Sequence, residues 1–145
     1  MFVEIRASQI SEADALEKLD KSGCGSTVTF SGIVRPTEGG RTISSLHYEH
    51  YPGMAERMIT VIAADVMKKF DIRDAVVIHR TGDVPAGEIG VSVAVSSERR
   101  KDGFRACEEI IDRLKTTVPI WKKDIGEVTR WQSEELQKKE SRKQK

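Results

Sequence analysis

The sequence predicts a single α+β domain with a mainly antiparallel sheet. Two observations carry this prediction. Segments with strand periodicity are interspersed with segments of helical periodicity, and the hairpin-like links between neighbouring strands are too short for parallel crossovers. The chain has 145 residues, of which 38% are hydrophobic and 32% are charged, which suits one small core with a large solvated surface.

The elements are expected in the order strand, helix, two strands, helix, two strands, helix and short strands. Alternating apolar residues predict the strands, most clearly where Ile89, Val91, Val93 and Val95 share one face. Apolar residues at three- and four-residue spacing predict the helices. The expected strands are 2–6, 27–34, 42–51, 75–80, 89–95, 120–124 and 128–131. The expected helices run from a Ser8 or Ser11 cap through Leu19 to a stop at Ser22-Gly23, over 54–69 and over 101–117.

The links between these elements contain glycine, proline and charged residues. Residues 36–40 are expected to form a loose, charged tip between strands 27–34 and 42–51, which we expect to pair as a hairpin. Residues 82–87 are expected to be a turn-rich link without regular structure.

The end of the chain has a different composition from the rest. Residues 132–145 contain a single leucine among charged and polar residues, too little apolar surface to offset the entropy of ordering. We therefore expect one domain over residues 1–131, followed by a charged, disordered tail.

Composition also excludes several classes of protein. The 24 basic and 23 acidic residues leave a formal net charge of +1, so no overall field attracts nucleic acid or an anionic membrane. The sequence has no apolar run that could span a bilayer and no signal peptide, which predicts a cytoplasmic protein. Cys24 and Cys107 are expected to be reduced, inert thiols, and the scattered His47, His50 and His79 predict no metal site.

Cationic residues gather between positions 99 and 123. Arg99 and Arg100 lie where a strand ends and the last helix begins, so their guanidinium groups and the free helix N–H groups could face one anion, such as a phosphate. The alternative is a solvated basic face, which is the more common use of such a cluster.

Lys115 falls on the edge of the apolar stripe of the last helix, beside Phe104 and Ile111. Partial desolvation there would lower the pKa of its amine and make it reactive near neutral pH. The alternative is a side chain that snorkels its ammonium group into water. After Pro119, one following lysine could return toward Lys115, or Trp121 could anchor in the core and leave the lysines solvated.

Five segments in order resemble the large, catalytic subunit of molybdopterin synthase. They are GIVRPTEGG (32–40), LHYEHYPGMAE (46–56), VIHRTGDVPAGE (77–88), SSERRKDGFRAC (96–107) and LKTTVPIWKKD (114–124), followed by Arg130-Trp131. The resemblance covers nearly the whole chain up to Trp131, and its most specific element is L-K-x-x-x-P-x-W-K.

The resemblance implies an α/β hammerhead fold and a homodimer with a ubiquitin-like small subunit at each end, which makes a heterotetramer. The implied enzyme is a sulfurtransferase of molybdenum cofactor biosynthesis. It moves sulfur from the C-terminal thiocarboxylate of the small subunit to cyclic pyranopterin monophosphate, and two transfers give the dithiolene of molybdopterin. No cofactor is implied, because the small subunit supplies the sulfur.

The resemblance also implies roles for individual residues. Lys115 and Lys122 match the two catalytic, substrate-binding lysines of the family, and Arg35 matches its pocket arginine. Arg99 and Arg100 match a His-Arg pair that binds the pterin, in a pocket completed by residues from the neighbouring protomer. Arg99 departs from the family here, since arginine keeps the charge of a protonated histidine but cannot titrate near neutral pH.

Two alternatives follow from these residues. A catalytically weakened paralogue that only binds the small subunit is compatible with the loss of the histidine at Arg99. A nucleic-acid role for the basic tail is disfavoured, because Glu134, Glu135 and Glu140 interrupt its charge and it has no aromatic residue for stacking.

Overall fold

The computed structural model describes residues 1–126, 130 and 131. Within them, the sheet with the greater number of residues, the larger sheet, has four strands in the order β1 (Phe2–Arg6), β5 (Ile72–Arg80), β7 (Ile89–Ser97) and β2 (Ser26–Ile33). β1 is parallel to β5, whereas β7 is antiparallel to both of its neighbours. The sheet is therefore mainly antiparallel, as expected, with one parallel strand at its edge.

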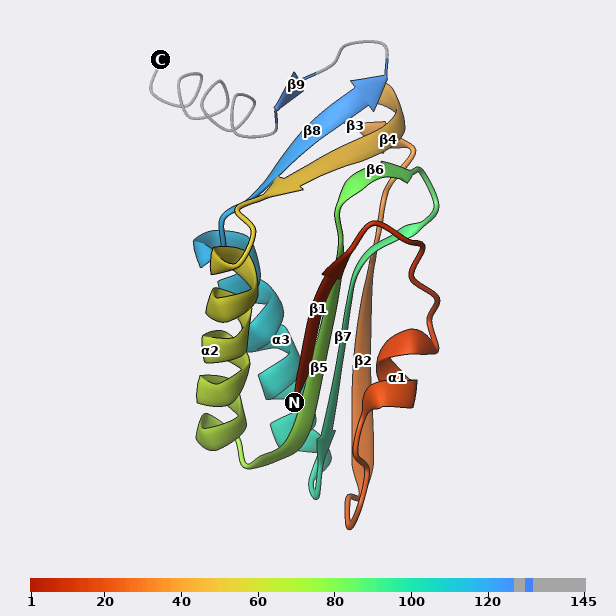
Figure 1. Cartoon of the computed structure of the whole chain (residues 1–145). Helices are drawn as coiled ribbons and strands as arrows, with labels where there is room; N and C mark the ends of the chain where they lie inside the picture. The colour runs from red at the N-terminus through yellow and green to blue at the C-terminus, as the bar shows by residue number, and fades with distance from the viewer. Residues whose placement is uncertain (127–129, 132–145) are drawn as a thin grey trace, which may run out of the picture.

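Helices cover both faces of this sheet (Figure 1). α2 (Met54–Lys69) and α3 (Arg100–Thr117) pack on one face, where the main core includes Ile59, Val93 and Ile110. The short helix α1 (Asp14–Lys18) closes a second core on the opposite face. All three expected helices are present, and both long ones keep the positions that their apolar periodicity predicts.

A second sheet lies beyond the ends of α2 and α3 (Figure 1) and is built around the long strand β4 (Arg41–His50). β4 pairs with β3, β6 and β8, and β8 pairs with β9. A small third core, which includes Tyr48 and Val84, lies beneath it. The bounds of these partners are Thr37–Glu38 for β3, Gly82–Pro85 for β6, Ile120–Gly126 for β8 and Arg130–Trp131 for β9.

The expected hairpin between residues 27–34 and 42–51 is wrong. β2 pairs with β7 in the larger sheet, and β4 belongs to the second sheet. The register of β2 shifts at Gly32–Ile33, and Pro36 follows, which has no N–H to donate to a strand ladder. The chain therefore leaves one sheet and enters the other.

Two expected links also contain strand. Residues 82–85 form β6. Its sequence shows no alternation of apolar and polar residues, because Val84 is the one side chain of this strand that is fully buried. Inside 36–40, β3 and β4 form a tight hairpin across Gly39 and Gly40. Both glycines have positive φ, the requirement of a type I′ turn.

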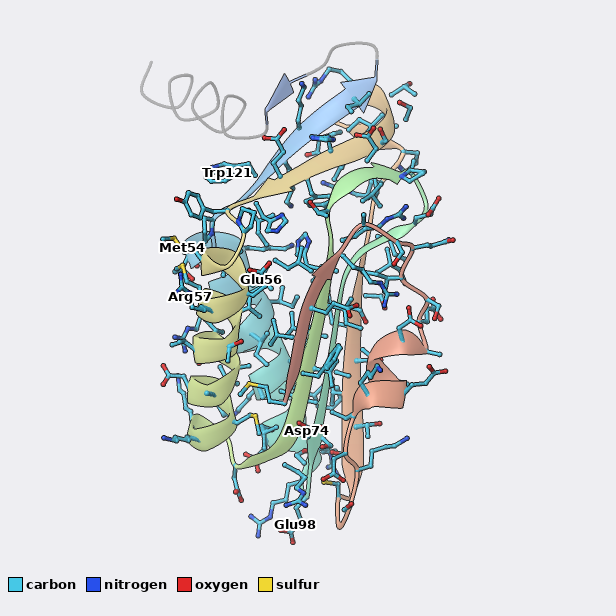
Figure 2. The ribbon with its side chains drawn as sticks, in the orientation of Figure 1. Met54, Glu56, Arg57, Asp74, Glu98 and Trp121 are labelled. Carbon is cyan, nitrogen blue, oxygen red and sulfur yellow. The ribbon has the colours of Figure 1, made fainter. Side chains whose placement is uncertain are left out.

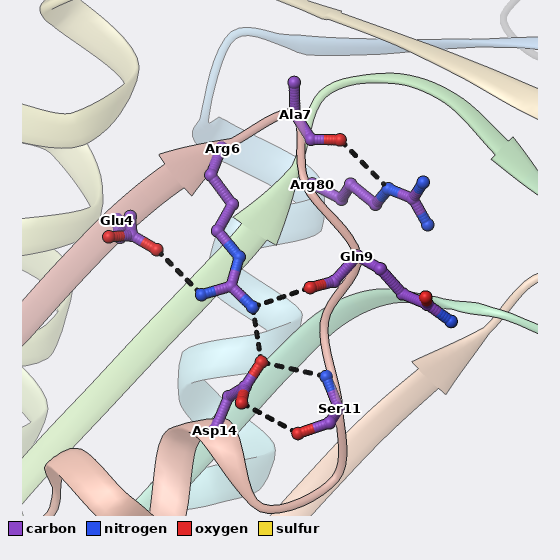
Figure 3. A network of polar contacts seen from close by, with 7 residues as sticks. All are labelled: Glu4, Arg6, Ala7, Gln9, Ser11, Asp14 and Arg80. Carbon is purple, nitrogen blue, oxygen red and sulfur yellow. Dashed lines mark hydrogen bonds and ion pairs between the residues drawn. The ribbon is translucent and has the colours of Figure 1, made fainter.

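The first helix is shorter than expected and is not capped by a serine. It begins at Asp14 with Ala13 as its N-cap, and no side chain caps it. Ser11 instead donates its N–H (2.9 Å) and its hydroxyl (2.7 Å) to the Asp14 carboxylate, which also pairs with Arg6 (Figure 3). These bonds, chiefly those from Ser11, hold the pKa of Asp14 at about 2.

The last part of the chain is only partly described. The strand expected at 120–124 is present and continues to Gly126. The strand expected at 128–131 is described only at its last two residues, and the expected tail at 132–145 lies outside the described residues. The division into a domain over 1–131 and a tail stays a prediction.

Candidate active site

Lys115 and Lys122 line one pocket, with a volume of about 320 Å³. Lys115 lies in the last turn of α3, which ends at Thr117, two positions before Pro119. The chain then reverses and enters β8. This reversal returns Lys122 toward Lys115, so the first of the two arrangements considered for the residues after Pro119 is correct. Trp121 is not a core anchor, because it is 47% exposed.

The pocket lies between the two sheets and the end of α3. Arg35 reaches it from the link between β2 and β3, and Glu38 reaches it from β3. The Arg35 Nη2 donates to the Glu38 Oε2 at 2.6 Å. The remaining lining residues are Phe30, Ser31, Gly32, Ile33, Ile43, Leu46, Tyr48 and Val91.

The desolvated lysine is Lys122. Its pKa is lowered mainly by burial and further by the charges of Lys115 and Arg35, against the opposing effect of Glu38 and Asp124. Lys115 is exposed, so the expected desolvation of that amine is wrong. Phe104 does not cover it either, because Phe104 is itself 61% exposed.

Two buried aromatic side chains to which the sequence assigned no role in this pocket lie behind Lys122. Tyr48 is the direct cross-strand partner of Lys122 between β4 and β8. The His79 ring packs edge-on against Tyr48, with ring centroids 5.0 Å apart. The pKa of His79 is lowered to about 4, mainly by burial, and the charge of Lys122 contributes in the same direction. His79 is therefore neutral at physiological pH.

Tyr48 has little freedom to move in this arrangement. Burial raises the pKa of its hydroxyl to about 12. A Cβ atom at Gly90 would lie 2.8 Å from the Tyr48 Oη, so only glycine leaves room for the ring here. Tyr48 and His79 together give Lys122 an uncharged wall.

Arg99 and Arg100 lie elsewhere in the chain. They border a hollow at the N-terminal end of α3, next to Gly25 and Ser26. Figure 2 shows this end, marked by Glu98, opposite the end that carries Trp121. From Arg100 to Lys115 the helix rises by about 22 Å. A single chain therefore does not bring the two arginines to the lysine pocket.

Both cysteines are free thiols in the described structure. Cys107 is buried in the main core, burial raises the pKa of its thiol to about 11, and Cys24 and Cys107 are not bonded to each other. Among the described residues, no three His, Cys, Asp or Glu side chains gather as metal ligands. None of the helices in the described part of the chain could cross a membrane.

A desolvated amine with two further cations in one pocket is typical of an enzyme that acts on an anionic substrate. The fold and the pocket thus indicate an α+β enzyme that binds an anionic substrate.

The MoaE protein family matches residues 5–117 of the chain. The molybdopterin synthase catalytic subunit of Thermoplasma volcanium is 41% identical over 126 residues, which cover 87% of this chain and 92% of that protein. The structure of molybdopterin synthase from Staphylococcus aureus superimposes with a TM-score of 0.83 at 36% identity, and the match covers 88% of this chain and 94% of that one.

A third match shows the fold alone. The complex of subunits 1 and 2 of molybdopterin-converting factor from Helicobacter pylori contains a chain with a TM-score of 0.74 at 22% identity, covering 89% of this chain and 88% of that one.

The protein described here belongs to the MoaE protein family and is an enzyme of molybdenum cofactor biosynthesis. The resemblance found in the sequence and its α+β fold class are confirmed.

Proposed function

We propose that this chain is a sulfurtransferase that converts cyclic pyranopterin monophosphate to molybdopterin. The sulfur comes from the C-terminal thiocarboxylate of a ubiquitin-like small subunit, and no cofactor takes part. The observation that carries this proposal is the pocket in which Lys122, with its lowered pKa, lies with Lys115 and Arg35.

The chemistry of the pocket suits this reaction. The phosphate and the thiocarboxylate are both anions, so three cations can hold them together and stabilise negative charge that develops during transfer. Lys122 is the group suited to exchange a proton, because burial and neighbouring cations destabilise its ammonium form. Lys115 and Arg35, both exposed at the pocket, are suited to contact the phosphate and the incoming tail.

The proposed assembly is a homodimer that carries two small subunits. Arg99 and Arg100 lie too far from the lysine pocket to serve it within one chain. A neighbouring protomer can bring its own Arg99 and Arg100 to the pocket, as the sequence resemblance implies. The Helicobacter pylori relative is a complex of two subunits, which agrees with a small-subunit partner. A cytoplasmic location is part of the proposal, since unpaired thiols suit a reducing compartment.

Reconstitution tests this function directly. The purified chain, mixed with thiocarboxylated small subunit and cyclic pyranopterin monophosphate, should form dithiolene product, measured by mass spectrometry after oxidation to a stable pterin derivative. Small subunit with an ordinary carboxylate terminus is the control and should give no product. A chain that binds the small subunit but forms no dithiolene would contradict the proposal and support the weakened paralogue instead.

A further inference from the structure

The lysine pocket contains one acidic side chain, Glu38, among the described residues that line it. The Glu38 side chain is only 22% exposed, whereas its partner Arg35 is 73% exposed. The Arg35 Nη2 lies 2.6 Å from the Glu38 Oε2. The carboxylate is thus held in the pocket wall, and the guanidinium group reaches it from the solvent side.

The backbone fixes the position of this carboxylate. Glu38 pairs with Arg41 in the β3–β4 hairpin, and the two-residue turn at Gly39-Gly40, where both glycines have positive φ, sets the register of the pair. The Ile43 N–H donates to the Pro36 carbonyl at 2.8 Å and closes the base of the hairpin. Glu38 therefore lies on a tight hairpin, with Arg35 only three residues before it.

The Glu38 charge also acts on Lys122. It opposes the effects of burial, Lys115 and Arg35 on Lys122, because a nearby carboxylate favours the ammonium form. Three cationic side chains and one carboxylate leave two positive charges facing the pocket. Two is also the number of singly charged anionic groups, a cyclic phosphate and a thiocarboxylate, that the proposed reaction brings together.

We propose that Glu38 is an internal counter-anion: it forms an ion pair with Arg35 in the free enzyme, and the anionic group of the ligand displaces it from Arg35. Glu38 thereby determines how strongly the pocket holds anions. This inference rests on the proposed function only in taking the lysine pocket as the substrate pocket. Glu38 affects substrate affinity and not the chemical step, because it competes with the substrate for Arg35 and does not react with it.

Inorganic phosphate is the probe that tests this role. Glu38→Gln keeps the shape of the side chain and removes its charge, so phosphate should bind about threefold to tenfold more tightly than to the wild-type protein, as measured by calorimetry at low salt. Glu49→Gln is the matched control, because Glu49 is an exposed acid on β4 outside the pocket. It should leave the affinity unchanged.

A double variant shows whether Glu38 acts through Arg35. In an Arg35→Gln background, adding Glu38→Gln should change phosphate affinity less than it does with Arg35 present. Equal affinities of the wild-type and Glu38→Gln proteins, including a lack of binding in both, would overturn the inference, as would an equal gain in Glu49→Gln.

The assembled synthase separates this inference from the proposed function. With the small subunit present, Glu38→Gln should lower the KM for cyclic pyranopterin monophosphate more than it changes kcat. An active wild-type enzyme with unchanged phosphate affinity and KM in Glu38→Gln would refute the role of Glu38 and leave the proposed function intact. An inactive wild-type enzyme whose Glu38→Gln variant binds phosphate more tightly would refute the function and support the counter-anion.

Discussion

Replacing Lys122 by alanine should slow dithiolene formation by about 100- to 1,000-fold, the usual cost of removing one stabilising group from an active site. The fold should persist, because the substitution removes a desolvated charge from a pocket wall and no core packing. Single-turnover formation of dithiolene, with thermal unfolding as the check on folding, measures both effects.

Lys123→Ala is the matched control for this prediction. Lys123 is the next residue of β8 but does not line the pocket, so its loss should leave the rate within a few-fold of the wild-type value. Wild-type activity in Lys122→Ala would contradict the assigned role. Lys115→Ala should also stop sulfur transfer, because the exposed ammonium group of Lys115 is the second lysine of the pocket.

The pH–rate profile distinguishes a titrating lysine from a fixed charge. Because the pKa of Lys122 lies below its ordinary value of 10.5, the limb of the profile that reports Lys122 should lie below pH 10.5. Lys122→Arg keeps the charge and does not titrate in this range, so that limb should disappear in the variant. A limb that persists unchanged would assign the titration to another group.

Lowering the pH from 7 to 5 should destabilise the protein, and His79 should be the main cause. His79 has a pKa of about 4 when folded and 6.5 as its ordinary value. Between these values the unfolded chain binds a proton that the folded protein does not. The contribution of neutral His79 to the free energy of unfolding is therefore fully present above pH 6.5 and falls as the pH drops toward 4.

The expected loss is about 2 kcal/mol between pH 7 and pH 5, measured as the free energy of unfolding in urea. His79→Phe keeps an aromatic ring against Tyr48 but does not titrate, so its stability should change much less over the same range. Parallel pH dependence of the wild-type and variant proteins would show that His79 is not the group responsible.

The sequence singled out Lys115 and Lys122, which line one pocket, but it predicted desolvation at Lys115 and the structure has it at Lys122. Helical spacing places Lys115 beside the apolar stripe of α3, yet the last turn of that helix borders the pocket and leaves the side chain exposed. The burial of Lys122 depends on pairing between β8 and β4, where its partner is Tyr48. Local periodicity reports which side of an element is apolar and contains no information about such distant pairs.

Strand pairing set the limit of the fold prediction in the same way. The alternation at 89–95 and the helical spacing at 54–69 are local, and the structure has β7 and α2 there. β2 pairs with β7 at the edge of the larger sheet. The prediction favoured β4 only because it follows β2 closely along the chain, and sequence proximity does not show which sheet edge is open. His79 was missed because an isolated histidine in a strand has no distinguishing spacing, and its contact with Tyr48 exists only after the two sheets meet.

A mixture of two slow variants tests the central claim, sulfur transfer in a pocket shared by two protomers. Arg100→Ala and Lys122→Ala proteins are each prepared alone, then mixed and allowed to exchange protomers before thiocarboxylated small subunit and cyclic pyranopterin monophosphate are added. A mixed dimer contains one pocket with an intact Lys122 and an intact Arg100 from its neighbour. The mixture should therefore form dithiolene much faster than either variant does alone. A mixture with verified exchange that stays as slow as its components would contradict the account.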